Sequence, residues 1–157
     1  MKYTRLTKEQ LEELHPEFIN FLASQSITGE EWSKIKKEQP QVAEDELDVF
    51  SDLIWEGVLS KASYLQNASP NQLFLFHTGI KEMQLIVVKT TVLHIDLTTK
   101  EGLQWLQANI QKDGVELFTA SKAYGEDRNM DIFKLIQQGA TITNGTLYNA
   151  LSEFLGN

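Results

Sequence analysis

Residues 72–98 read QLFLFHTGIKEMQLIVVKTTVLHIDLT, and this stretch decides the fold. Its apolar residues form short runs rich in β-branched and aromatic side chains, and such runs are typical of strands. We predict three strands, at residues 72–78, 83–89 and 92–98. Segment 78–82 is then a hairpin loop in which Gly79 supplies the difficult backbone dihedral angles. Residues 89–91 are either a tight turn or a bend within one long strand.

The first two of these strands are apolar on both faces. Neither Leu73-Phe74-Leu75-Phe76 nor Leu85-Ile86-Val87-Val88 contains a polar residue, and a strand of this kind is covered on both sides. Either helices flank the sheet on two faces, or one face meets a partner chain. The sequence leaves both explanations open, and the second one predicts a homodimer.

Residues 1–66 have the hydrophobic periodicity of helices. Two capping-box patterns mark helix starts, Thr7 with Gln10 and Thr28 with Glu31. Pro16 ends one short helix and begins the next, because proline is tolerated in a first turn. Pro40 stops the helix that starts near Thr28, and a long helix follows from about residue 42 to 65.

The polar, turn-forming residues 66–71 separate this helical part from the strands. Farther along the chain we predict a helix capped by Thr98 and Glu101, a fourth strand at 115–121, and helices at about 129–138 and 145–155. Strands grouped after a run of helices favour an α+β domain. We therefore predict one domain over residues 1–157. A helical layer (1–66) packs on a mainly antiparallel sheet of about four strands, and C-terminal helices complete the strand-rich part (70–157).

The chain has 157 residues, of which 22 are acidic and 14 are basic, so its net charge is −8. A nucleic-acid-binding domain would normally show a basic excess, and an acidic surface also disfavours anionic lipid. The absence of cysteine excludes thiolate nucleophiles, iron–sulfur clusters and cysteine-type zinc sites. No apolar run suits a signal peptide or a membrane span. We expect a cytoplasmic protein that binds neither nucleic acid nor membrane.

Three residues form a candidate metal site: His77, His94 and Asp96. Strand alternation places His94 and Asp96 on one face, and His77 converges on them if the predicted strands pair. Two imidazoles and a carboxylate form a ligand set for a divalent metal with open coordination positions. An aspartate beside a histidine also suits a general base with its orienting partner. The alternative is that these residues mark a half-solvated edge region. The sequence predicts no other cofactor.

Four acidic residues recur at every fourth position of the predicted long helix: Glu44, Asp48, Asp52 and Glu56. We call them the acidic ladder, because side chains at this spacing form one ridge. Like charges four residues apart repel each other by about 0.2–0.5 kcal/mol per pair. No Lys or Arg lies between Lys37 and Lys61 to compensate them. The ladder is a solvated or intramolecularly paired face, a docking surface for a basic protein partner, or part of a Mg²⁺ site.

One further polar loop, residues 123–129, precedes a predicted helix and contains one of the two arginines, Arg128. Arg128 either pairs with Asp131 or binds a phosphate. The chain lacks the glycine-rich loops of nucleotide-binding proteins, the Gly-x-Ser-x-Gly motif and the His-Glu-x-x-His motif. The common nucleotide-binding, hydrolase and zinc-protease interpretations therefore lose their usual support.

Three segments carry a resemblance to a known family: residues 14–22 (LHPEFINFL), 32–36 (WSKIK) and 50–59 (FSDLIWEGVL). They resemble segments of a family of short, uncharacterised bacterial proteins, found chiefly in the Bacteroidota. The likeness spans nearly the whole chain. It implies a bacterial cytoplasmic protein, and it transfers no activity and no catalytic residue.

The sequence therefore predicts a non-catalytic interaction or regulatory module. Such a module would associate with itself or bind a basic protein partner through the acidic ladder. The alternative is a small metal-dependent enzyme of the hydrolase type that uses His77, His94 and Asp96. A third class of function is a pocket that binds a small ligand between the helices and the sheet.

Overall fold

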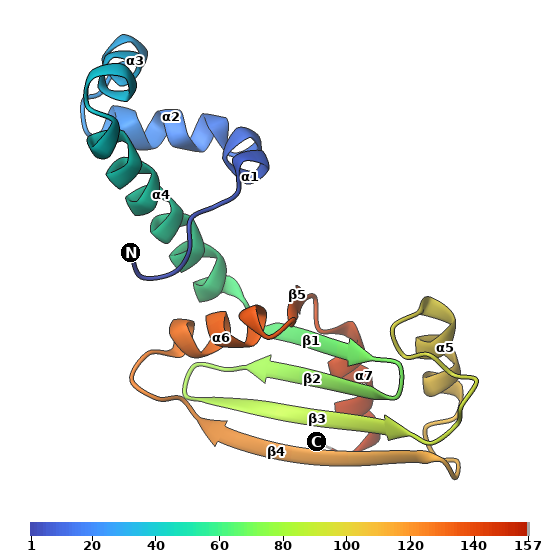
Figure 1. The fold of residues 1–157 in the computed structure, drawn as a ribbon. Helices are drawn as coiled ribbons and strands as arrows, with labels where there is room; N and C mark the ends of the chain where they lie inside the picture. Colours follow the sequence, from blue (N-terminus) through green and yellow to red (C-terminus); the bar gives the residue numbers. More distant parts are fainter. Residues whose placement is uncertain (157) are drawn as a thin grey trace. The chain divides into compact units, whose positions relative to one another are not determined.

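The computed structural model describes residues 1–156 (Figure 1). The chain forms two compact units, one of residues Met1–Ser60 and one that starts at Lys61. The described residues contain seven helices and one antiparallel sheet of five strands. The α+β class and the C-terminal helices are confirmed, while the strand count is five instead of about four.

The first unit is helical. Its elements are α1 (Lys8–Glu13), α2 (His15–Ser24), α3 (Gly29–Glu38) and α4 (Pro40–Lys61), the last of which ends at the start of the second unit. Both predicted helix starts are confirmed, since the Thr7 hydroxyl accepts a hydrogen bond from the Gln10 N–H at 3.1 Å and the Thr28 hydroxyl accepts one from the Glu31 N–H at 3.1 Å. The buried residues of this unit include Leu6, Phe18, Leu22 and Phe50.

The second unit is built on the sheet. Its strands are β1 (Tyr64–Ser69), β2 (Gln72–Thr78), β3 (Glu82–Thr90), β4 (Val115–Ala123) and β5 (Thr141–Thr143). Their order across the sheet is β4-β3-β2-β1-β5, and each neighbouring pair is antiparallel. The long strand β4 and the short strand β5 are therefore the two edges.

The prediction missed β1. Residues 66–71 are not a break between two parts, because Gln66–Ser69 belong to β1 and only Pro70 and Asn71 form the turn into β2. Because Gln66 and Asn67 are polar, the sequence of β1 lacks the apolar pattern that is typical of a strand. Leu65 carries the apolar signal, and only 1 % of this residue is exposed.

The prediction of a strand at residues 92–98 is wrong. This segment is a series of turns that leads into α5 (Lys100–Ala108). The Asp96 carboxylate accepts hydrogen bonds from the Thr98 N–H at 2.9 Å and the Thr98 hydroxyl at 2.5 Å, and this local pairing replaces a strand ladder. The N-cap of α5 is Thr99, one residue after the predicted Thr98.

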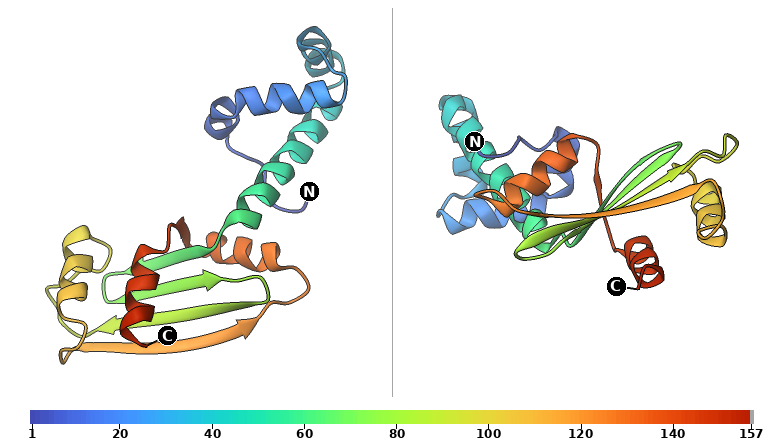
Figure 2. Two further views of the ribbon diagram at one scale, coloured as in Figure 1. Left: turned by 180° about the vertical axis from the view of Figure 1, so that it is seen from behind. Right: turned by 90° about the horizontal axis from the view of Figure 1, so that it is seen from below.

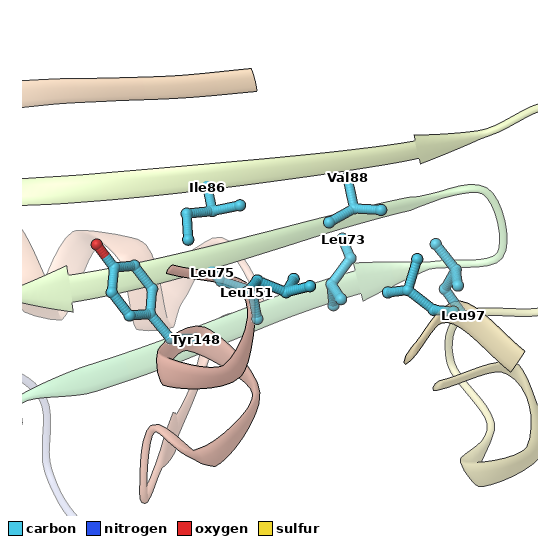
Figure 3. Packing of buried hydrophobic residues seen from close by; sticks show 8 residues of the cluster. Leu73, Leu75, Ile86, Val88, Leu97, Tyr148 and Leu151 are labelled. Carbon is cyan, nitrogen blue, oxygen red and sulfur yellow. The ribbon is translucent and has the colours of Figure 1, made fainter. Parts of the chain in front are cut away.

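Helices cover both faces of the sheet. Helix α6 (Arg128–Gln137) lies on one side, and α7 (Thr146–Phe154) lies on the other, as the view from below shows (Figure 2). On the α7 side, Tyr148 and Leu151 pack against alternate residues of β2 and β3 (Figure 3). Those strand residues are Leu73, Leu75, Ile86 and Val88. Helices on both sides of the sheet therefore explain why β2 and β3 are apolar on both faces. This was the first of the two explanations that the sequence left open.

Candidate functional site

The structure separates the three candidate metal ligands. His77 lies near the end of β2 and pairs with Gln84 of β3, whereas His94 and Asp96 follow the opposite end of β3. The part of β2 from His77 to Gln72, about 17 Å long, lies between these two places. The described residues contain no group of three His, Asp or Glu side chains that could hold a metal ion. The metal-dependent alternative is therefore not favoured.

His77 has a different environment from the predicted one. Its ring stacks on Tyr64 with centroids 4.9 Å apart, and the Tyr148 ring lies 5.6 Å from it. Aromatic pairs at such separations stabilise a fold by about 0.5–1.5 kcal/mol beyond the area they bury. Burial raises the pKa of Tyr148, and the neighbouring Tyr64 raises it further. His77 therefore joins β1, β2 and α7 by aromatic packing.

The acidic ladder lies on α4, as predicted, and all four of its residues contact the N-terminal segment Lys2–Arg5. Asp52 accepts the backbone N–H groups of Lys2 and Tyr3 at 2.7 and 2.9 Å. Glu56 accepts the Tyr3 hydroxyl at 2.5 Å and lies 3.5 Å from the Lys2 ammonium.

Arg5 contacts the other half of the ladder. Its guanidinium bonds to Asp48 through Nε at 2.8 Å and forms an ion pair with Glu44. These two hydrogen bonds raise the pKa of Arg5. The positive charges that the helix itself lacks thus come from the first residues of the chain. Docking of a basic protein partner on the ladder stays a prediction, and such a partner would compete with Lys2–Arg5.

The guanidinium of Arg128 contacts backbone carbonyl groups near the start of the sheet. Its guanidinium donates to the carbonyl oxygens of Ala62 at 2.7 Å, Thr78 at 3.0 Å and Gly79 at 3.1 Å. Asp131 accepts the Gly125 N–H at 2.9 Å. Arg128 therefore fixes the start of α6 against the entry to β1 and the β2–β3 turn.

The most exposed element of the sheet is β4. Its register pairs every residue from Val115 to Ala123 with β3, and no strand of the described chain lies on its other side. Seven of its nine residues are exposed, whereas β3 alternates between buried and partly exposed residues along its second half. Figure 1 shows this open edge at the bottom of the sheet. Unpaired N–H and C=O groups of such an edge can accept another strand.

A groove lies beside β4 on the α6 side of the sheet. It has a volume of about 490 Å³, and β2, β3, β4 and α6 all contribute to its walls. Phe76, Met83 and Leu85 form an apolar floor, and Lys122 and Lys134 stand among the polar lining residues. The apolar surface continues along the strands to Phe118, which is 49 % exposed.

A second recess, of about 450 Å³, lies on the α7 side. It is more polar, because its lining includes Gln84, Thr119, Ser121 and Ser152. The two hollows lie on opposite faces of the sheet, because residues of α6 line the first and residues of α7 line the second. Strand β4 is therefore accessible from its edge and from both of its faces.

A comparison with protein-family models shows which family the chain belongs to. Residues 1–156 match a model described as "Family of unknown function (DUF6495)". The chain belongs to this family. The DUF6495 model spans both units, so the helical unit and the sheet unit together define the family. The predicted resemblance to an uncharacterised family is confirmed.

Comparisons of this DUF6495 chain with curated proteins and with solved structures found no match. Membership in DUF6495 carries no activity with it, so the candidate site depends on the geometry of β4 and its two hollows. No helix within residues 1–156 has the length and the apolar character needed to cross a membrane.

Proposed function

We propose that the protein is a non-catalytic interaction module that binds another protein through the open side of its sheet. This surface consists of the edge of β4 and the groove on the α6 side. The observation that carries the proposal is a nine-residue edge strand that is exposed at seven residues. Natural proteins usually shorten, cover or twist such edges, and a long uncovered edge is suited to strand addition by a partner.

The groove supports the same proposal. An added strand would supply backbone hydrogen bonds at the β4 edge, and its side chains would reach the apolar surface at Phe118 and Ala120. Peptide recognition of this kind takes its affinity from the backbone ladder and its specificity from side-chain pockets beside it. The groove of about 490 Å³ is a pocket of that kind.

The test compares two variants that each remove one exposed apolar side chain. Phe118→Ser alters β4, and Leu93→Ser is the matched control in a turn, where Leu93 is fully exposed. Tagged wild-type protein and both variants are used to capture proteins from the lysate of source cells, after circular dichroism has shown that all three are folded. We expect at least one captured protein to be lost with Phe118→Ser and kept with Leu93→Ser. Identical capture by all three proteins would contradict the proposal.

A further inference from the structure

The sequence of β4 is complementary to itself. We propose that the partner of the β4 edge is a second copy of this chain. The two β4 strands would pair antiparallel about a twofold axis at Thr119, and the two sheets would join into one of ten strands. This inference rests on the proposed function and specifies which partner occupies the edge.

The charges of β4 favour this pairing. Glu116 and Lys122 lie on the same face of the strand and three positions on either side of Thr119. In an antiparallel pair centred on Thr119, Glu116 of each copy lies opposite Lys122 of the other. Opposite charges placed across two strands attract each other, and a symmetric dimer contains this pair twice.

Side-chain size is complementary as well. Phe118, 49 % exposed, would lie opposite Ala120 of the second copy, so that a large residue meets a small one. Thr119 would face Thr119, a cross-strand pair that is favourable in sheets. Leu117 would face Ser121 on the α7 side. No two bulky residues oppose each other in this register.

Other registers lose these features. Centring the pair on Phe118 places Glu116 opposite Ala120 and one Phe118 ring opposite the other. Centring it on Ala120 places Phe118 opposite Lys122. Only the Thr119 register pairs all residues from Val115 to Ala123, because Thr119 is the middle residue of β4. Full pairing forms about eight to ten backbone hydrogen bonds between the two strands.

The register is tested first by cross-linking. The chain contains no cysteine, so each single-cysteine variant has only one thiol. In the proposed dimer, Thr119→Cys places two thiols directly opposite each other, whereas the matched control Ser121→Cys separates them by about 14 Å along the strands. We expect mild oxidation to give a disulfide-linked dimer of Thr119→Cys and a monomer of Ser121→Cys. Equal cross-linking of both variants, or of neither, would overturn the proposed register.

The charge pair is tested by reversal and exchange. Glu116→Lys and Lys122→Glu each create like charges across the interface, and we expect each to raise the dimer dissociation constant about tenfold or more in sedimentation experiments. The double variant should recover wild-type association. An equimolar mixture of the two single variants should form a heterodimer, because every charge then faces its opposite. Lys100→Glu, an exposed substitution outside β4, is the control. Reversals that leave the dissociation constant unchanged would overturn the inference.

The failure of this inference is distinguishable from failure of the proposed function. A chain that stays monomeric at all concentrations, but loses a captured protein with Phe118→Ser, excludes the second copy and retains the interaction function. In that case Lys122 acts as a charge that protects the edge from self-pairing. If the chain is monomeric and the wild type and Phe118→Ser capture the same proteins, both the dimer and the proposed interaction function are excluded.

Discussion

At the scale of single residues, Gly145 occupies a position that leaves no room for a side chain. Its φ of +80° belongs to the left-handed region, and a Cβ atom there would lie 2.4 Å from the Tyr64 ring. The same ring stacks on His77, so the space is already filled from the other side. Gly145 therefore allows β5 to turn into α7 while Tyr64 stays in place.

Replacing Gly145 by alanine should destabilise the protein by about 2–4 kcal/mol, because it combines a left-handed backbone penalty with overpacking. Gly125→Ala is the control. Its added Cβ would make an ordinary contact at 3.7 Å, and the backbone of Gly125 needs no positive φ. Chemical unfolding followed by circular dichroism measures both changes. Equal stability of the two variants would mean that Tyr64 moves aside at no cost.

The stabilisation that the N-terminal segment gives to the fold depends on pH through Tyr3. Burial and the hydrogen bond to Glu56 raise the pKa of Tyr3 from 10.0 to about 12. A pKa that is higher in the folded than in the unfolded state stabilises the fold fully below pH 10. This stabilisation is lost as the pH rises through about 12.

We expect Tyr3→Phe to cost about 1 kcal/mol at pH 8, since it removes a partly exposed hydrogen bond to a carboxylate. The wild type should lose this advantage between pH 10 and 12, because only the wild type has the hydroxyl that ionises. Urea unfolding of both proteins at several pH values measures the difference between their free energies of unfolding. The other ionising groups are the same in both proteins, so their contributions cancel. A difference that stays constant from pH 8 to pH 12 would contradict the assignment.

At the scale of elements, local signals predicted the helices well. Thr7 and Thr28 cap helices through contacts only three residues away, so their sequence patterns are sufficient. The strand β1 and the turns at residues 92–98 were assigned wrongly for one shared reason. Whether each segment forms a strand depends on its hydrogen-bond partners. Gln66 pairs with residues of β2 and β5, and the latter lies far away in the chain. Asp96 hydrogen-bonds to its neighbour Thr98, and this local contact takes the place of strand pairing.

The candidate sites also divide into features that local spacing predicts and features that depend on distant residues. The four-residue spacing predicted the acidic ladder as one ridge on α4. Its counter-charges were missed because Arg5 lies 39 positions from Glu44 and 43 from Asp48. A signal existed, since Arg5 is one of only two arginines in an acidic chain. Nothing in the sequence identified β4 as an edge, because strand order is a property of the whole sheet.

At the scale of the whole molecule, the proposed dimer predicts that stability depends on concentration. An oligomer that is held together only in the folded state unfolds at a higher temperature when it is more concentrated. We expect the melting temperature of the wild type to rise by about 2–3 °C per tenfold increase in concentration. Lys122→Glu should show a smaller rise, and differential scanning fluorimetry over two orders of magnitude in concentration measures both. A wild-type melting temperature that is independent of concentration would contradict the dimer.

The pairing of β5 with β1 has a consequence for synthesis of the chain on the ribosome. Gln66 and Thr141 are neighbours in the sheet but lie 75 positions apart in the sequence. At about 5–20 residues per second, the outer edge of β1 waits about 4–15 seconds for its partner. The first unit has all of its residues available before that interval begins. A nascent chain halted ahead of Thr141 would therefore contain the complete helical unit beside a sheet with two open edges, a product prone to aggregate and be degraded.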